Sequence, residues 1–145
     1  MKEEAEIAQS RRPHAETTDS YLQILVKMVN DVEERISLPI TLLVGGTLVS
    51  GLLIGIREYF ESFAEEFTKT FADREAAASV RESIVPDLSA PSEGDPLPQY
   101  IHLKDARYYG APGGPIVAGP GVLWRGRISE VGGFHYGRLT PLPEQ

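Results

Sequence analysis

The chain of 145 residues is acidic, with a formal net charge of −7, and it contains no cysteine. This length fits one domain with one buried core, and the negative charge disfavours a general nucleic-acid binder. The lack of cysteine excludes disulfides, thiolate metal sites and thiol catalysis, and it fits a reducing compartment. Because Met1–Ser20 has no apolar stretch of the secretory type, the expected location is the cytoplasm.

The first segments in chain order are an arm and a helix. Residues 1–18 are polar and charged, which predicts a disordered arm. Asp19 or Ser20 can cap a helix, which should end at Arg35, close to the negative end of the helix dipole. Apolar residues recur in it at three- and four-residue steps, so one face should pack on a sheet. These residues are Leu22, Leu25, Val29 and Val32.

The next segment, Ile36–Ile56, carries no charge. Its β-branched residues favour strands, and Gly45-Gly46 is a strong hairpin signal because glycine adopts the positive φ of tight turns. We therefore expect Ile36–Val44 and Thr47–Ile56 to be paired strands. The alternative is a membrane-spanning helix, for which the length is just sufficient.

A second helical pattern begins at Arg57 and extends to about Ile84. Its phenylalanines form one stripe, which predicts a long amphipathic helix that covers the sheet. They are Phe60, Phe63, Phe67 and Phe71. Pro86 stops this helix, because the residue before a proline avoids helical angles, and the proline-rich residues 86–99 predict a flexible linker.

The C-terminal third alternates strand-like segments with glycine-rich breaks. Its expected elements are a strand Tyr100–Tyr109, a Gly/Pro-rich loop 110–121, a strand Val122–Val131, a hairpin turn at Gly132-Gly133, a strand Phe134–Leu139 and a tail 140–145. The whole pattern predicts a single α+β domain over residues 19–139. It should contain a mainly antiparallel sheet of two hairpins plus one strand, with an N-terminal helix and a long amphipathic helix packed on it.

No set of residues in the sequence makes a complete catalytic or metal site. His102 and His135 lie on strands that could be neighbours, but no carboxylate or third histidine is spaced to complete a zinc site. Paired carboxylates such as Glu65-Glu66 fit the solvated face of a helix, and the glycines of 110–121 lack the Lys-Ser/Thr that follows a phosphate-binding loop. We therefore expect no metal, no cofactor and no enzyme activity.

An acidic helix and a basic pair of strands suggest a charged interaction surface. Arg125 and Arg127 lie two residues apart and would project beside Lys104 if their strands pair. Two interpretations stay open: solvent-facing charge paired within the chain, or a basic surface that docks an acidic helix of a partner or of another copy. A head-to-tail contact of that kind would weaken with salt. The candidate residues are Lys104, Arg125, Arg127, Arg138, Glu58, Glu61 and Glu65.

Three segments of the chain resemble a known family. They are Ile40–Phe60 (ITLLVGGTLVSGLLIGIREYF), Tyr100–Lys104 (YIHLK) and Trp124–Leu139 (WRGRISEVGGFHYGRL). Together they resemble the gas vesicle accessory protein GvpU family, in which a "V-S-G" strand leads into "E-Y-F" and a final "W-R-G-R-I-S-E-V-x-G-F" is the most specific part. The arm, the linker and the loop 110–121 depart from that pattern.

The resemblance implies a non-enzymatic accessory role in the formation or clustering of gas vesicles, the protein-shelled, gas-filled buoyancy compartments of prokaryotic cytoplasm. It implies binding to shell protein, to other accessory proteins and to further copies of the chain, with no nucleic acid, lipid membrane or cofactor. Two alternatives remain. One is an Sm-like small barrel that binds RNA, suggested by a helix followed by glycine-linked strands. The other is a small integral membrane protein.

Overall fold

The computed structural model describes residues 18–31, 33–88, 94–110 and 120–140. Its helices are α2 (Ser20–Asp31), α3 (Ile56–Thr68) and α4 (Arg74–Ile84). Its strands are β1 (Leu38–Val44), β2 (Thr47–Ile54), β3 (Tyr100–Tyr109), β4 (Val122–Arg127) and β5 (Val131–Tyr136), with a short 3-10 helix η1 (Ile128–Glu130) before β5. These elements confirm the predicted α+β class. The predicted arm, the middle of the linker, most of the Gly/Pro-rich loop and the end of the tail lie outside the described residues.

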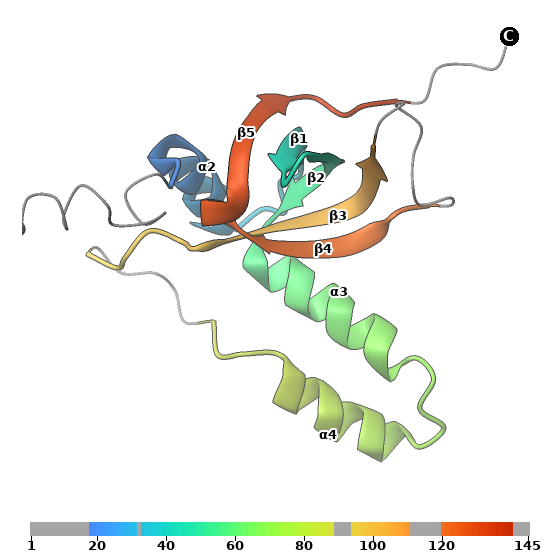
Figure 1. The fold of residues 1–145 in the computed structure, drawn as a ribbon. Coiled ribbons are helices and arrows are strands. Elements are labelled where there is room, and N and C mark those ends of the chain that lie inside the picture. The colour runs from blue at the N-terminus through green and yellow to red at the C-terminus, as the bar shows by residue number, and fades with distance from the viewer. Residues whose placement is uncertain (1–17, 32, 89–93, 111–119, 141–145) are drawn as a thin grey trace, which may run out of the picture.

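The described residues form two parts (Figure 1). The five strands make one antiparallel sheet with α2 against it, and we call this unit the sheet body. Helices α3 and α4 lie side by side and project from it, and we call them the helical hairpin. The hairpin is inserted between β2 and β3 in the sequence.

β1 and β2 form the predicted hairpin, in which Val44 lies opposite Thr47. Gly45 and Gly46 occupy the turn with φ values of 56° and 81°, a left-handed conformation that glycine adopts easily and that this type of turn requires. The uncharged run therefore folds back on itself. Within the described ranges, no helix has both the length and the apolar character needed to cross a membrane.

The last two strands lie at opposite edges of the sheet, whose order is β4-β3-β2-β1-β5. The second antiparallel pair is β3 with β4, so the prediction of a hairpin turn at Gly132-Gly133 is wrong. Both glycines lie within β5. The chain changes direction in η1 instead, where Ile128 is fully buried and its N–H donates to the carbonyl of Gln99 at 2.9 Å. Burial of this one side chain holds the turn on the core.

The segment after β5 shows that the sheet is strongly curled. The N–H of Leu139 donates to Ser50 Oγ in β2 at 2.7 Å, and the hydroxyl of Tyr109 at the end of β3 donates to the carbonyl of Leu139 at 3.1 Å. A segment that leaves from the β5 edge reaches β3 only if the sheet bends around its core.

One face of α2 packs on the inner face of the sheet. Asp19 caps the helix as predicted, because its Oδ1 accepts from the N–H groups of Tyr21 and Leu22 at 3.0 and 3.2 Å. The helix ends at Asp31 rather than at the predicted Arg35. The buried core consists of Leu22, Val26, Val29, Ile40, Leu42, Val49, Leu53, Ile101, Leu103, Ala106, Ile128 and Val131.

The predicted long amphipathic helix is two helices. α3 ends at Thr68, whose hydroxyl donates to the carbonyl of Ala64 at 2.7 Å. α4 then begins at Arg74, after Asp73, whose side chain accepts from the N–H of Glu75 at 2.9 Å. A side-chain cap at Asp73 stabilises a new helix start, so the chain turns where helix propensity alone had predicted continuity.

The prediction that the phenylalanine stripe covers the sheet is wrong for most of its length. Phe63 and Phe67 keep 38% and 50% of their surface exposed, and their rings lie 6.2 Å apart along the stripe. Phe60 is the member that reaches the sheet body, with its ring 5.8 Å from that of His102. The reason is the direction of α3, which leads away from the sheet body so that its later turns lose contact with the strands (Figure 1).

Candidate interaction surfaces

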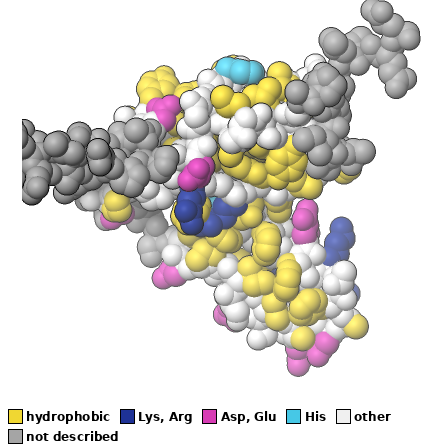
Figure 2. All heavy atoms as spheres, viewed as in Figure 1, with side chains coloured by type: hydrophobic (Ala, Val, Ile, Leu, Met, Phe, Trp, Pro, Cys, Tyr) yellow, Lys and Arg dark blue, Asp and Glu magenta, His cyan; other side chains and the backbone are white. Residues whose placement is uncertain are grey.

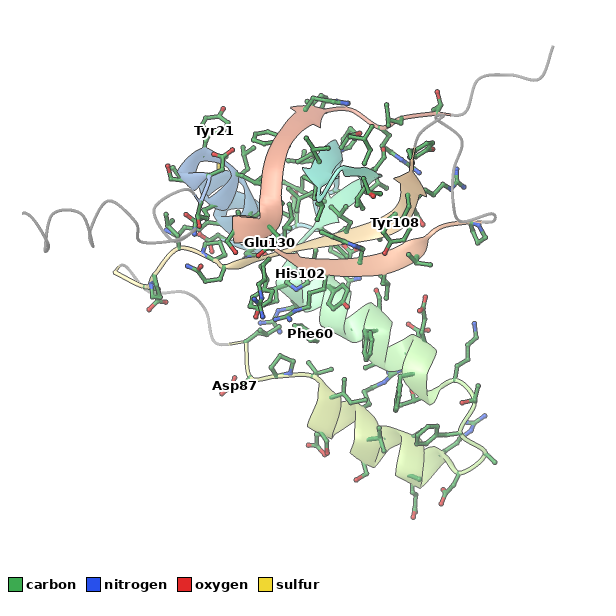
Figure 3. All side chains as sticks on the ribbon, in the orientation of Figure 1. Tyr21, Phe60, Asp87, His102, Tyr108 and Glu130 are labelled. Atoms are coloured by element: carbon green, nitrogen blue, oxygen red, sulfur yellow. The ribbon has the colours of Figure 1, made fainter. Side chains whose placement is uncertain are left out.

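The junction between the sheet body and the helical hairpin is an aromatic and cationic cluster. Tyr59, the most buried aromatic residue of α3, places its ring 4.6 Å from the ring of His102 in β3. Arg125 lies opposite His102 in the β3–β4 register, and its Nε donates to His102 Nε2 at 3.2 Å. The Arg125 guanidinium also lies 3.7 Å above the ring of Tyr100, a favourable cation–π geometry. Figure 3 shows Phe60 and His102 together at this junction.

His102 is the one histidine of the described strands that is buried, with 1% of its surface exposed. Burial, together with the nearby positive charge of Arg125 as the smaller cause, lowers the pKa of His102 from 6.5 to about 4. Because Nε2 accepts from Arg125, the proton of the neutral ring is on Nδ1. Nδ1 has no hydrogen-bond partner among the described residues. His102 is thus a neutral packing residue at neutral pH.

Nothing in the cluster suggests acid–base or metal chemistry. The rings of Tyr59 and Phe60 and the guanidinium of Arg125 surround His102, and burial raises the pKa of the Tyr59 hydroxyl, partly offset by Arg125. His135 lies on β5 opposite Thr41, so the expectation that the strands of His102 and His135 are neighbours is wrong. In the described ranges, no three His, Cys, Asp or Glu side chains are grouped as metal ligands.

The acidic helix and the basic strands that the sequence singled out meet within one chain. Lys104 Nζ lies 3.0 Å from Glu58 Oε2, and Glu61 of α3 pairs with Arg35. Arg125 is stacked on Tyr100 as described above. The in-chain pairing that the sequence left open therefore accounts for much of the candidate charged surface.

The other three candidate residues are exposed and lie apart from one another. Arg127 is opposite Tyr100 in the β3–β4 register, whereas Arg138 follows β5 in the segment that bonds to Ser50 and Tyr109. Tyr100 and Tyr109 are the two ends of β3, which a strand of this length separates by about 30 Å. Glu65 is on α3. The seven candidates therefore do not form one continuous surface.

Sequence reasoning missed two exposed apolar surfaces. The first is on the outer side of α2, where Tyr21, Ile24 and Met28 are 65%, 47% and 59% exposed. The second is the stripe of Phe63 and Phe67 on the helical hairpin, where Figure 2 shows apolar side chains gathered with charged side chains at their margin. The signal in α2 was present: seven of the eleven residues from Ser20 to Asn30 are apolar, more than one core-facing stripe requires.

The molecule is thus an α+β protein in which α2 and α3 each leave large apolar side chains exposed. Its sequence from residue 19 to residue 139 matches the family model described as gas vesicle protein GvpU-like. The chain therefore belongs to the GvpU-like family, an accessory and structural family of gas vesicle proteins and not a known enzyme family. This match confirms the resemblance seen in the three segments. No curated protein and no solved structure matches the chain.

Proposed function

We propose that this protein is a non-enzymatic, cytoplasmic gas vesicle accessory protein that binds shell protein or other accessory proteins, and further copies of itself. It would act during vesicle formation or in the clustering of vesicles. The family match supports the gas vesicle role. The observation that supports the binding role is that α4 of the helical hairpin contributes no buried residue.

The helical hairpin is suited to binding another protein because it exposes apolar side chains away from the sheet body. Monomeric proteins rarely leave contiguous apolar patches uncovered, and such patches commonly mark interaction sites. Phe63 and Phe67 supply large aromatic rings, which dominate the energetics of protein interfaces. The hairpin would therefore carry the partner, while the sheet body positions it.

The charged residues have a smaller role in this proposal. Arg127, exposed at the end of β4, would meet an acidic partner, and Glu65 would meet a basic one. Contacts of this kind mainly steer encounter and weaken with salt. Lys104 and Arg125 are held by Glu58, His102 and Tyr100 within the chain, so removal of these two would disturb the junction first.

Flotation tests the proposal directly, because gas vesicles rise and carry bound protein with them. Purified full-length protein mixed with purified vesicles should collect in the floating layer. Phe67→Glu should reduce the floated fraction several-fold, and Arg127→Glu should reduce it less and mainly at low salt. Val122→Glu, an apolar-to-acidic change at an exposed position of β4 outside the candidate surface, is the matched control and should float like the unchanged protein.

The outcome against the proposal is equally direct. Protein that stays below the vesicle layer at every salt concentration, and that recovers RNA without any vesicle protein from producing cells, would overturn it. That result would favour the RNA-binding alternative, which the net charge of −7 argues against.

A further inference from the structure

Helix α2 has two apolar faces, of which the sheet covers one. Leu22, Val26 and Val29 are buried against the strands. Tyr21, Ile24 and Met28 recur on the other side at three- and four-residue steps and are exposed. We call these three residues the α2 face. Tyr21 stacks on Phe134 with ring centroids 6.4 Å apart, and Figure 3 shows it on the outer side of α2.

Helix α3 carries the second uncovered stripe, which we call the phenylalanine face. Its centre is Phe63 and Phe67, one helical turn apart, with their rings stacked at an interplanar angle of 11°. Phe71 continues the stripe, with its ring 5.9 Å from that of Phe67. Figure 1 shows α2 and the helical hairpin on different sides of the sheet body. The two faces therefore cannot cover each other within one copy.

The two faces match in size and in chemistry. α2 has 12 residues and α3 has 13, so both helices are about 20 Å long. Aromatic rings and a methionine thioether make favourable contacts with each other. One helix laid on another is also the usual way to bury an apolar stripe.

Charge favours pairing of unlike faces over pairing of like faces. Exposed Glu66 lies three residues from Phe63, and so beside the phenylalanine face; two such faces brought together would place carboxylates near carboxylates. The α2 face offers a different environment, because Lys27 is the one charged residue from Ser20 to Asn30. An acidic margin on one face and a lysine beside the other are complementary.

We propose that the α2 face of one copy packs on the phenylalanine face of the next copy. This inference names the surfaces for the self-association part of the proposed function and in that sense rests on it. Because the two faces lie on different sides of the molecule, the contact is head-to-tail, and each added copy leaves one face of each kind free. Such a contact generates an open series of copies rather than a closed dimer.

The contact is small, so each step is weak. Two helices about 20 Å long and 10 Å wide cover much less than the roughly 1,200–2,000 Å² that stable interfaces bury. We expect dissociation constants on the order of 10–100 μM for each step. Since the contact is apolar, sulfate should strengthen it, whereas the charged contact considered from the sequence would weaken with salt.

Sedimentation of purified full-length protein, without vesicles, tests this inference. The mean mass should rise continuously with concentration through the micromolar range. Met28→Glu and Phe67→Glu should each remain monomeric, because each removes one of the two faces. An equimolar mixture of the two variants should form a heterodimer and stop there, since the one intact face of each meets the other. Val122→Glu, an apolar-to-acidic change on β4, is the control and should leave the series intact.

A second measurement uses the lack of native cysteine. Met28→Cys and Phe67→Cys, mixed under mild oxidation, should give a mixed disulfide at a higher yield than either variant alone. Both positions are exposed, and circular dichroism checks that the variants are folded.

Three results would overturn the inference. The first is a protein that stays monomeric to several hundred micromolar. The second is dissociation by Phe67→Glu with no effect of Met28→Glu, which indicates a symmetric contact. The third is no mixed disulfide. Failure of this inference is distinguishable from failure of vesicle binding through Met28, which is assigned to the contact between copies alone: Met28→Glu should still float with vesicles.

Discussion

The sheet body and the helical hairpin are stabilised in different ways. In the sheet body every strand except β4 contributes a fully or nearly fully buried apolar side chain, and α2 adds three more. In the hairpin α4 buries no residue, and α3 buries Tyr59, Ala64 and Thr68. The body therefore depends on a shared interior, while the hairpin depends on helix caps, local packing and the junction at His102.

This difference favours the binding role proposed for the helical hairpin. Elements with few buried apolar contacts open at low free-energy cost, and they adapt to a partner more easily than a packed core does. The sheet body, by contrast, fixes where the hairpin begins, since α3 follows β2 after a single residue, Gly55. The N–H of Ile56 also bonds to Asn30 Oδ1 at 2.9 Å, which ties the start of α3 to α2.

The largest contrast is expected from truncation of one apolar side chain in each part. Leu53→Ala in β2 should lower the free energy of unfolding by about 3–5 kcal/mol, because Leu53 has no exposed surface and its removal leaves a cavity. Phe67→Ala should change it by less than about 1 kcal/mol, since half of that side chain is already in water. Chemical denaturation measures both, and equal losses would contradict the division into two parts.

The junction should make stability depend on pH. The folded pKa of His102 is about 4, below the ordinary 6.5, so the unfolded chain binds a proton more readily. The contribution of His102 to the free energy of unfolding is complete above pH 6.5. It is lost as the pH falls toward 4, and the total loss is roughly 3 kcal/mol.

The variant His102→Gln isolates this effect, because its amide oxygen can still accept from Arg125 while the group no longer titrates. As the pH falls from 6.5 to 4, the unfolding free energy of the unchanged protein should decrease relative to that of His102→Gln. His135→Gln, at an exposed position, is the control. A pH-independent difference would show that His102 is not held neutral.

Helix caps compare the two parts with the same chemical change. Asp19→Ala and Asp73→Ala each remove a capping carboxylate, worth about 1 kcal/mol. Because α2 packs on the core, loss of Asp19 should appear in global denaturation. Loss of Asp73 should appear instead as about five-fold faster amide hydrogen exchange within α4, with little change in global stability. A global loss for Asp73→Ala would mean that α4 unfolds together with the sheet body.

The smallest effect is expected from the ion pair that joins the two parts. Lys104 and Glu58 should couple by roughly 0.5–1 kcal/mol in a double-mutant cycle, because the Lys104 side chain is partly exposed and screened by water. The coupling should fall as salt is added. A coupling that is zero at low salt would indicate that the pair does not help to position the hairpin.

Local signals predicted several elements correctly. The β1–β2 hairpin followed from Gly45-Gly46, the start of α2 from Asp19, and the bounds of β3 from the segment Tyr100–Tyr109. Each of these depends on residues close in sequence. The role of the charged candidates in binding stays a prediction. The sequence could not foresee that Lys104 meets Glu58 of its own chain, because that pairing depends on contacts between residues far apart in the sequence.

The sequence by itself determined the class, the family and the alternation of helices and strands, because hydrophobic period, turn glycines and family motifs are local. The tertiary structure decided that Gly132 and Gly133 lie inside a strand, since burial of Ile128 moves the turn to η1. It also decided that the phenylalanine stripe faces water. A stripe can cover a sheet if its helix lies along the strands, and α3 leads away from them.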